Sequence, residues 1–555
     1  MAFSPIFPIS AVALFATFAL WKLFTYARKD TPVHCFLTAY GAFVLTFSSA
    51  VLLPYDIVVT IDRGSFDPQI RLLWKVLYWS LWTFNWFFLP VFIEQQRTGS
   101  WRTSFRNNGI WWLGYLVIGI ITLCYYLGTV GFTSISEIYW FFYAMSYAFS
   151  NAYGLVLISV LLGYAFVALP QHLADISNPA TYLNVLYARV VSADEARLNT
   201  KFDLEDRFNA YRQEGHTAEN RKAAEIVASA AKFLNKSLTE SSGHLRARRS
   251  NSEDGLVAQL TDSSIGRLAD ALGNAERRIF KYEELVQECI ESENYLANDI
   301  TPMNRKYEDI KLVIYKIASY ATGGLSLVTI IAQATIFIPL WWLSVLAIMY
   351  RLLVVTHSEH ATSEFWTICL QILVALPLTY SYLASFWAAF RFKLSNSYGL
   401  YPNHNTDAYS LMWCSSILSR TAFSTCYNYI FVLRMQNDQV DTGFMNTMKK
   451  LSMVPLFGDT FVMLLPFLIV LLAVMQYTRT YHKIIHWLGL TMLQMESAVY
   501  AGSGEPIVKE GKAIVARERQ KRSMSTHDAI GRNERTAPLI KSSFEMGILQ
   551  KNDIL

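Results

Sequence analysis

Nine apolar runs, each long enough to cross a lipid bilayer, constrain this chain more than any other feature. About 20 apolar residues in a helix cross the roughly 30 Å of hydrocarbon, and inside lipid a helix satisfies its own backbone hydrogen bonds. The runs therefore predict an all-α polytopic integral membrane protein with nine transmembrane helices. They occupy 7–24, 33–53, 72–92, 110–130, 140–169, 314–338, 365–390, 408–433 and 454–477.

Charge is distributed unevenly along the chain. Only 16% of the residues are charged, against about 25% in ordinary soluble proteins, which excludes a soluble globular enzyme. Of the 48 basic and 43 acidic residues, 42 lie within 170–311. The spans are therefore arranged 5+4 around a charged cytoplasmic insertion. We predict spans one to five in 1–169, a coiled-coil region in 170–311, spans six to nine in 312–480 with a short interfacial segment near 340–355, and a largely disordered cytoplasmic tail in 481–555.

Basic residues in the short connections indicate the orientation, because loops rich in Lys and Arg stay in the cytoplasm. The connections 28–32, 94–109, 391–407 and 479–483 hold nine Lys and Arg residues, whereas the opposite connections hold six. We therefore expect the N-terminus outside, and the charged insertion and the C-terminus in the cytoplasm.

The charged insertion contains a heptad pattern, in which apolar residues recur in steps of three and four. This spacing is typical of a coiled-coil seam. The pattern resumes between Leu296 and Ile310, and Pro302 predicts an interruption of the helix. A second helix, about 193–238, either folds back on the first within one chain or leaves the seam free to pair two chains; the intramolecular hairpin is favoured. The first part of the pattern is Ile265, Leu268, Leu272, Ala275, Ile279, Tyr282, Val286 and Cys289.

No motif of enzyme chemistry stands out. The sequence contains no GxxxxGK[ST], HExxH, GxSxG or GxGxxG motif, and its six cysteines form no CxxC pair. His482 and His486 have the spacing of a shared metal site, but a solvated helix beside the membrane explains them more simply. We therefore predict a non-enzymatic protein with no catalytic residues, no metal, no cofactor and no nucleic-acid partner.

Polar side chains inside the predicted spans identify a candidate site. Asn85 lies in the middle of span three, and Arg420 and Asn428 lie two turns apart in span eight. An unpaired Arg in the middle of a bilayer costs at least about 2.5 kcal/mol, so Arg420 is expected to face a carboxylate, carbonyls or water. The three residues either line a functional cavity or form hydrogen bonds that fix helix packing. Asp56 is interpreted as a helix cap at the interface, with a cation site as the lesser alternative.

Several strings resemble the limb-region-like (LMBR-like) membrane proteins, the family that includes the lipocalin receptor and the lysosomal cobalamin exporter. His404 to Leu411 reads HNTDAYSL, includes Asp407 and Tyr409, and is similar to the entry into span eight of the domain-containing-protein-two branch. Pro54 and Asp56 resemble the family's proline-aspartate end of span two.

The resemblance implies a nine-span, non-enzymatic protein of the plasma membrane or the endolysosomal membrane. Its first implied function is that of a receptor-like regulator of receptor signalling or trafficking. The spans would hold it in the lipid bilayer, and the coiled coil would bind cytoplasmic or membrane protein partners. The alternative is a transporter or transport subunit for a small, vitamin-like solute, with Arg420 beside the solute path. The resemblance identifies no small-molecule ligand.

Overall fold

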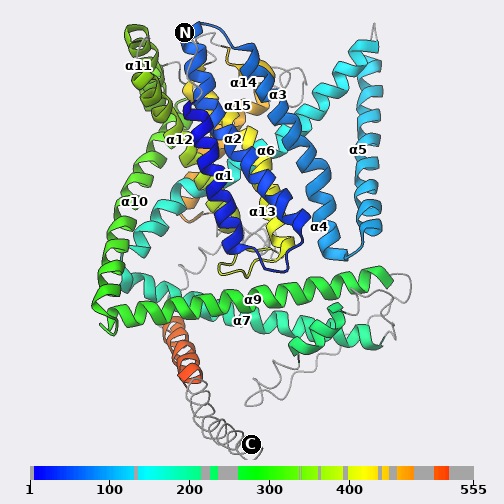
Figure 1. The fold of residues 1–555 in the computed structure, drawn as a ribbon, viewed down its shortest axis with the longest axis vertical. Helices are drawn as coiled ribbons and strands as arrows, with labels where there is room; N and C mark the ends of the chain where they lie inside the picture. The colour runs from blue at the N-terminus through cyan, green and yellow to red at the C-terminus, as the bar shows by residue number, and fades with distance from the viewer. Residues whose placement is uncertain are drawn as a thin grey trace, which may run out of the picture. The chain divides into compact units, whose positions relative to one another are not determined.

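The computed structural model describes residues 6–129, 135–213, 225–234, 261–336, 338, 340–360, 364–391, 398–435, 441–448, 459–480 and 506–523. These residues form helices and connecting loops (Figure 1), and across these ranges no strand occurs apart from an isolated parallel bridge between Ala27 and Thr406. The predicted all-α class is confirmed. The helices are α1 (Ile6–Tyr26), α2 (Val33–Arg63), α3 (Pro68–Thr83), the π-helix η1 (Phe84–Phe88), α4 (Leu89–Thr98), α5 (Trp101–Thr129), α6 (Ile135–Ile176), α7 (Pro179–Gln213), α9 (Thr261–Leu296), α10 (Pro302–Ala334), the 3-10 helix η2 (Trp341–Leu343), α11 (Val345–His360), α12 (Glu364–Arg391), α13 (Ala408–Leu433), α14 (Gly443–Met448) and α15 (Asp459–Tyr477), and two further helices cover 225–234 and 506–523.

The chain divides into two compact units, each with a buried apolar core of its own. Unit 1 contains the segments Met1–Ala174, Thr200–Arg277 and Val313–Glu496. Unit 2 contains the segments Asp175–Asn199, Arg278–Leu312 and Ser497–Leu555.

Seven helices within the described residues have the length and hydropathy of a membrane span. They match the first seven of the nine predicted runs, so the polytopic membrane class is confirmed. The eighth run forms α13, which is not among the seven, and the ninth forms α15, whose apolar segment Leu464–Tyr477 is shorter. The seven are Pro8–Tyr26, Val33–Arg63, Pro68–Thr98, Trp101–Tyr125, Ala152–Ile176, Pro302–Ala334 and Gln371–Ala389.

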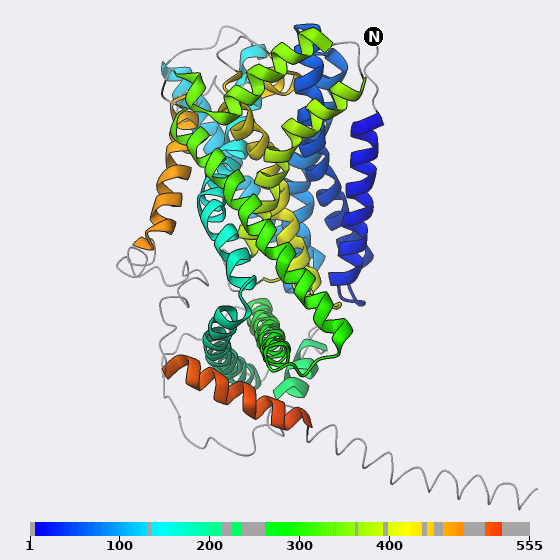
Figure 2. The same ribbon diagram turned by 90° about the vertical axis from the view of Figure 1, so that its left-hand side faces the viewer.

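Helix α13 contains many polar residues, and other helices surround it. Twenty of its 26 residues are buried. It contacts α2, α4 and α12, and α2 and α13 lie side by side in both views (Figure 1 and Figure 2). Its hydroxyl side chains donate to carbonyls one turn back, as Ser415 does to Leu411. A helix enclosed by protein therefore tolerates polar side chains that a lipid-facing helix does not.

Glycines let α6 approach two other helices of unit 1 closely. A Cβ added at Gly154 would lie 2.6 Å from the carbonyl oxygen of Arg420 in α13. A Cβ added at Gly163 would lie 2.6 Å from the Cβ of Leu472 in α15. Small residues at such positions permit backbone-level contact between membrane helices, so this face of α6 is used for internal packing.

The stretch near 340–355 forms η2 and α11. Tyr350, which interrupts the apolar run, is only 1% exposed. Helix α11 contacts α12 and α13. One face of α11 therefore packs against the other helices of unit 1, while Leu352 and Val355 are exposed.

Helices α7 and α9 lie side by side and run in opposite directions (Figure 1). In unit 1, Leu204 and Tyr211 from the second half of α7 share a buried cluster with Leu268 from the first half of α9. In unit 2, Tyr182 from the first half of α7 shares a buried cluster with Val286 from the second half of α9. We call this antiparallel pair the α7–α9 hairpin.

The heptad positions have different environments on the two sides of Pro302. Leu268 and Val286 in α9 are buried. Helix α9 ends at Leu296 and α10 begins at Pro302, so the predicted interruption is confirmed; proline suits the first position of a helix because its missing N–H has no helical partner there. Beyond the break, Met303 is 83% exposed. Leu296, at the end of α9, is already 46% exposed, so the buried packing is confined to the earlier positions in α9.

A helix over residues 506–523 lies within the region predicted as a largely disordered tail. Figure 2 shows this helix beside α7 and α9. In unit 2 its Ile514 and Val515 join the cluster formed by α7 and α9. Gly511 admits no larger residue, because an added Cβ would lie 2.3 Å from the carbonyl oxygen of Tyr187. Arg519 pairs with Glu293 of α9 at 3.2 Å. Apolar contacts and ion pairing therefore both hold this segment on the hairpin.

Candidate functional site

Pro90 leaves a backbone carbonyl of the third span without a helical partner. In the π-helix Phe84–Phe88, the N–H of Leu89 donates to the carbonyl of Phe84. It is therefore not available to Asn85, and Pro90 has no N–H to replace it. The carbonyl oxygen of Asn85 instead accepts a hydrogen bond from Nη2 of Arg420 at 3.2 Å. Irregular helical turns of this kind occur frequently at functional sites.

Arg420 projects from α13 and is half-buried. Besides the Asn85 carbonyl, its Nε donates to the Ser416 hydroxyl at 3.2 Å, and its guanidinium lies 5.1 Å from the centroid of the Tyr153 ring. Among the described residues no carboxylate forms an ion pair with it. Arg420 thus contacts a carbonyl, a hydroxyl and an aromatic face.

Arg420 lines a cleft between α4, α5, α6 and α13. The cleft has a volume of about 580 Å³, which lies within the range of about 300–1,000 Å³ for small-ligand pockets. Glu94 is the acidic residue that lines the cleft, and its carboxylate accepts hydrogen bonds from Arg97 at 3.1 Å and Asn107 at 2.8 Å. We call it the Arg420 cleft; its lining residues are Pro90, Ile93, Glu94, Arg97, Asn107, Asn108, Ile110, Trp111, Tyr153, Trp413, Ser416, Ile417 and Arg420.

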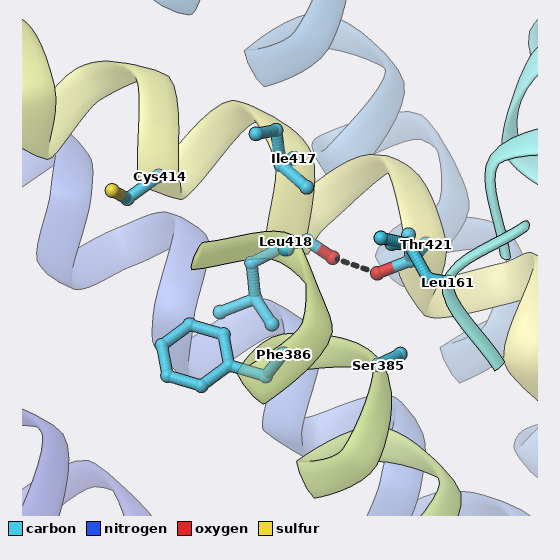
Figure 3. Close-up of a pocket in the computed structure, with 8 residues that line it drawn as sticks. Leu161, Ser385, Phe386, Cys414, Ile417, Leu418 and Thr421 are labelled. Atoms are coloured by element: carbon cyan, nitrogen blue, oxygen red, sulfur yellow. Dashed lines mark hydrogen bonds between the residues drawn. The ribbon is translucent and has the colours of Figure 1, made fainter. Parts of the chain in front are cut away.

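Another face of α13 is closed (Figure 3). There Leu161 of α6, Phe386 of α12 and Leu418 surround a gap that has no room for a water molecule. The Thr421 hydroxyl donates to the carbonyl of Leu418 at 2.9 Å and so does not face the gap as a free donor. Of these two spaces beside α13, the one that carries Arg420 is open and the one beside Leu418 is closed.

The structure brings two of the three predicted site residues together. The Asn85 side chain is 8% exposed and accepts a hydrogen bond from the Ser419 hydroxyl at 2.7 Å, while its backbone carbonyl binds Arg420. Asn428 is half-buried and does not line the Arg420 cleft. Within the described contacts, no hydrogen bond joins Asn428 to Arg420 or Asn85.

Asp56 lies inside α2, two residues beyond Pro54, and holds the start of α14. Its carboxylate accepts from the backbone N–H groups of Gly443 at 3.1 Å and Phe444 at 2.8 Å. The indole N–H of Trp74 also donates to it, at 2.9 Å. A negative charge is favourable at a helix N-terminus. Asp56 therefore caps a helix, as the sequence suggested, but that helix is α14 and not its own; these residues form the Asp56 junction.

The loop before α13, which carries the family-like HNTDAYSL string, joins α13 to the end of α1. The N–H of Thr406 donates to the carbonyl of Tyr26 at 3.0 Å, and the N–H of Arg28 donates to the carbonyl of Thr406 at 3.0 Å. The Thr406 hydroxyl accepts from the N–H of Tyr401 at 2.9 Å and donates to its carbonyl at 2.8 Å. Thr406 is fully buried, so this loop is a fixed part of the bundle.

Asp407 and Tyr409 connect the same loop to α9 within unit 1. The Asp407 carboxylate caps α13 by accepting from the N–H of Ser410 at 3.3 Å. It also pairs with Arg277 of α9 at 3.2 Å. The Arg277 guanidinium lies 5.8 Å from the centroid of the Tyr409 ring. The family-like string therefore contains two residues that bind α9, Asp407 and Tyr409.

A second ion pair adjoins the first. Glu276 of α9 pairs with Arg28, just beyond α1, at 3.4 Å. Burial raises the pKa of Glu276 above its ordinary value, and Asp407 raises it further, while Arg28 and Arg277 oppose the shift. Glu276 and Arg277 with Arg28 and Asp407 form the Asp407 junction.

Sequence reasoning missed Arg277 and Arg434. Arg277 is separated from Asp407 by 130 positions, and no motif relates them. Arg434 follows α13 directly and is 6% exposed; its guanidinium donates to the carbonyls of Ile338 at 2.8 Å and of Thr335. In the sequence, Arg434 lies at the end of a predicted span. An Arg at such a position is more simply interpreted as a residue at the membrane surface, so its burial was not predicted.

The described residues contain no group of three His, Cys, Asp or Glu side chains that could hold a metal ion. His482 and His486 lie outside these residues.

The chain is similar in sequence to a family of membrane proteins. The family described as LMBR1-like membrane protein matches residues 4–481. The chain is 20% identical to LMBR1 domain-containing protein 2 homolog A of Dictyostelium discoideum, over 82% of this chain and 63% of that protein, so it spans less than two thirds of this relative. No solved structure matches the chain significantly.

Two further relatives carry the name G-protein coupled receptor-associated protein LMBRD2. The human protein is 21% identical over 82% of this chain and 70% of its own length. The Caenorhabditis briggsae protein is 22% identical over 92% of this chain and 87% of its own length. These relatives belong to the branch that the sequence resembled, and that resemblance is confirmed. Because the family match covers most of its length, the chain belongs to the LMBR1-like membrane protein family.

Proposed function

We propose that this protein is a non-enzymatic, receptor-associated regulator, in which the membrane helices meet a membrane receptor and the α7–α9 hairpin binds further protein partners. The Asp407 junction is the observation that carries this proposal. There, Glu276 and Arg277 of α9 pair with Arg28 and Asp407, next to the ends of two membrane helices. Movement of either helix would therefore change contacts of the hairpin. The names of the relatives support association with a receptor of the G-protein coupled class.

The proposed topology has nine spans arranged 5+4, with the hairpin as a cytoplasmic coiled coil. It adds α13 and α15 to the seven helices of span-like length and hydropathy. Enclosure of α13 by other helices supports its inclusion, since its polar side chains do not need to face lipid. The bias of Lys and Arg supports an outside N-terminus and a cytoplasmic C-terminus. The membrane is proposed to be the plasma membrane or an endolysosomal membrane.

Recovery of a receptor panel tests the proposal. The full chain is expressed with tagged G-protein coupled receptors, and proximity labelling and co-purification are measured. Deletion of 193–311 is expected to abolish recovery of hairpin partners while the protein stays in the membrane. Arg277→Glu is expected to lower the recovery of hairpin partners several-fold, because it places a carboxylate against Asp407.

Arg207→Glu is the matched control. Arg207 pairs with Asp203 on the exposed surface of α7, where an ion pair contributes little, so recovery should stay at the wild-type level. Unchanged recovery after deletion of 193–311 would overturn the assignment of partners to the hairpin. Recovery of no receptor by the wild-type chain would overturn the receptor association itself.

The Arg420 cleft is the one observation that favours the second candidate, a transporter or transport subunit for a small solute. Purified protein in liposomes should then show solute flux that Arg420→Ala reduces without loss of folding. Equal flux in both proteins would remove Arg420 from the path. Absence of flux for every solute tested would favour the regulator.

A further inference from the structure

We infer that the Arg420 cleft binds an anionic amphiphile, with a carboxylate or phosphate head on the guanidinium of Arg420 and an apolar tail against α5. This inference goes beyond the proposed receptor association and is independent of it. It rests on three properties of the cleft: an uncompensated charge, spare donors next to that charge, and an opening onto apolar surface.

The charge of the cleft is not balanced by its own side chains. Glu94 is the acid that lines it, and its carboxylate is bonded to Arg97 and Asn107. Within the described residues no carboxylate pairs with Arg420. Arg420 is half-buried. A cation without a counter-charge is costly inside a membrane, and an anion from outside the chain would lower that cost.

Arg420 has donors left for such an anion. A guanidinium carries five N–H groups in a planar fork, and the described hydrogen bonds of Arg420 use Nε toward Ser416 and Nη2 toward Asn85. These two contacts, with the Tyr153 ring at 5.1 Å, hold the guanidinium in place. A preorganised fork suits the two oxygens of a carboxylate or phosphate.

The apolar part of the ligand follows from the opening of the cleft. Ile110 and Trp111 of α5 line the cleft and are 65% and 70% exposed. Only 6% of the apolar window of α5 is buried in the protein, so this helix faces the hydrocarbon of the bilayer. A molecule with one charged head and one apolar tail therefore satisfies both ends of the site, whereas a small hydrophilic anion satisfies only Arg420.

Binding to the purified full chain in detergent tests the inference. The probes are oleic acid, 1-oleoyl-lysophosphatidic acid and the uncharged monoolein, and affinity is measured by equilibrium binding and native mass spectrometry. At least one of the two anionic probes is expected to bind. The affinity for monoolein is expected to be lower by about tenfold or more. Preference for oleic acid would identify a fatty-acid site, and preference for the lysophospholipid would identify a phospholipid site.

Variants locate the site. Arg420→Gln is expected to weaken binding of the anionic probe by about tenfold or more, and Arg420→Lys to restore part of it. Arg391→Gln is the matched control, because Arg391 contacts His172 and Trp387 and does not line the cleft. Trp111→Ala alters an exposed side chain, so it should fold normally and still weaken binding several-fold. Equal affinity for monoolein, or unchanged affinity in both Arg420→Gln and Trp111→Ala, would overturn the inference.

Discussion

Asp56 and Asp407 both cap the start of a helix in unit 1, but they do so with different partners. Asp56 is fully buried, and its described partners are two backbone N–H groups, an indole N–H and the Thr60 hydroxyl. Asp407 is partly exposed and pairs with Arg277 from α9. The first aspartate joins parts of the bundle to each other. The second joins the bundle to the hairpin that we propose as the partner-binding element.

The difference separates a fixed connection from one that can be released. A buried carboxylate that accepts hydrogen bonds from rigid donors is expensive to uncover, because each donor then loses its partner. The Asp407 carboxylate is partly exposed, so water can take the place of its partner there, whereas Arg277 is only 7% exposed and the pair should contribute more than the roughly 0–1 kcal/mol of a surface pair. We therefore expect the Asp56 junction to set the stability of the bundle and the Asp407 junction to set the attachment of α9.

The largest expected effect is that of Asp56→Ala. It leaves the N–H groups of Gly443, Phe444 and Trp74 without an acceptor, so the free energy of unfolding should fall by about 3 kcal/mol or more. Chemical denaturation in detergent micelles measures this change. Asp62→Ala, on the exposed surface of the same helix, is the control and should change the free energy of unfolding by less than about 0.5 kcal/mol. Equal losses in the two variants would contradict the fixed role of Asp56.

A smaller loss is expected for Thr406→Ala, which acts beside Asp407. The buried N–H of Tyr401 loses its acceptor, and the free energy of unfolding should fall by about 1–3 kcal/mol. Thr406→Ser keeps the hydroxyl and should retain most of the stability in the same denaturation assay. If serine and alanine are equally destabilising, the methyl group of Thr406 matters more than its hydrogen bonds.

A double-mutant cycle isolates the ion pair between α9 and α13. Arg277→Ala and Asp407→Asn remove the two charges, and asparagine still caps α13. Because Arg277 is buried, their coupling energy should be about 1–3 kcal/mol. Hydrogen exchange of α9 around Arg277 reports the attachment of the helix. A coupling energy near zero would mean that the apolar contacts of α9 hold it without the ion pair.

The smallest effect is expected from pH, acting through Glu276. Because burial raises its pKa in the folded state, Glu276 favours attachment most at low pH, and this contribution is lost as the pH rises through the raised pKa. Hydrogen-exchange protection of α9, corrected for the intrinsic exchange rate, should therefore fall slightly as the pH is raised above the ordinary pKa of a glutamate. Glu276→Gln should remove this dependence; a variant that retains it would assign the pH effect to another group.

Periodicity predicted the local elements of this chain well. It identified the seven helices of span-like length and hydropathy, the break at Pro302 and the buried half of the heptad pattern in α9. The exposure of Met303 was not predictable, because heptad spacing shows that an apolar residue lies on one face of a helix and does not show whether a second helix packs on that face. The helix over 506–523 was missed for the converse reason: its many charges are typical of a solvated tail, while Ile514 and Val515 are buried against α7 and α9.

The candidate site was predictable in part. Arg420 and Asn85 were selected because polar groups inside a membrane are costly, and the structure joins them through the carbonyl that Pro90 leaves without a helical partner. Asn428 lies apart from them because its side chain points in another direction. Arg277 pairs with Asp407 because two segments far apart in the chain come into contact. Local patterns contain neither.

Hydrophobicity, charge distribution and the family-like strings were sufficient to establish an all-helical membrane protein of the LMBR1-like family. These properties act locally, since the bilayer selects each span by its length and hydropathy. Tertiary structure alone decided that a polar helix, α13, lies inside the bundle, that Asp56 caps α14, that Asp407 holds α9, and that Arg420 opens onto a cleft. The physical reason is that hydrogen bonds and ion pairs inside low-dielectric surroundings depend on which groups meet in space, and those meetings involve residues far apart in the chain.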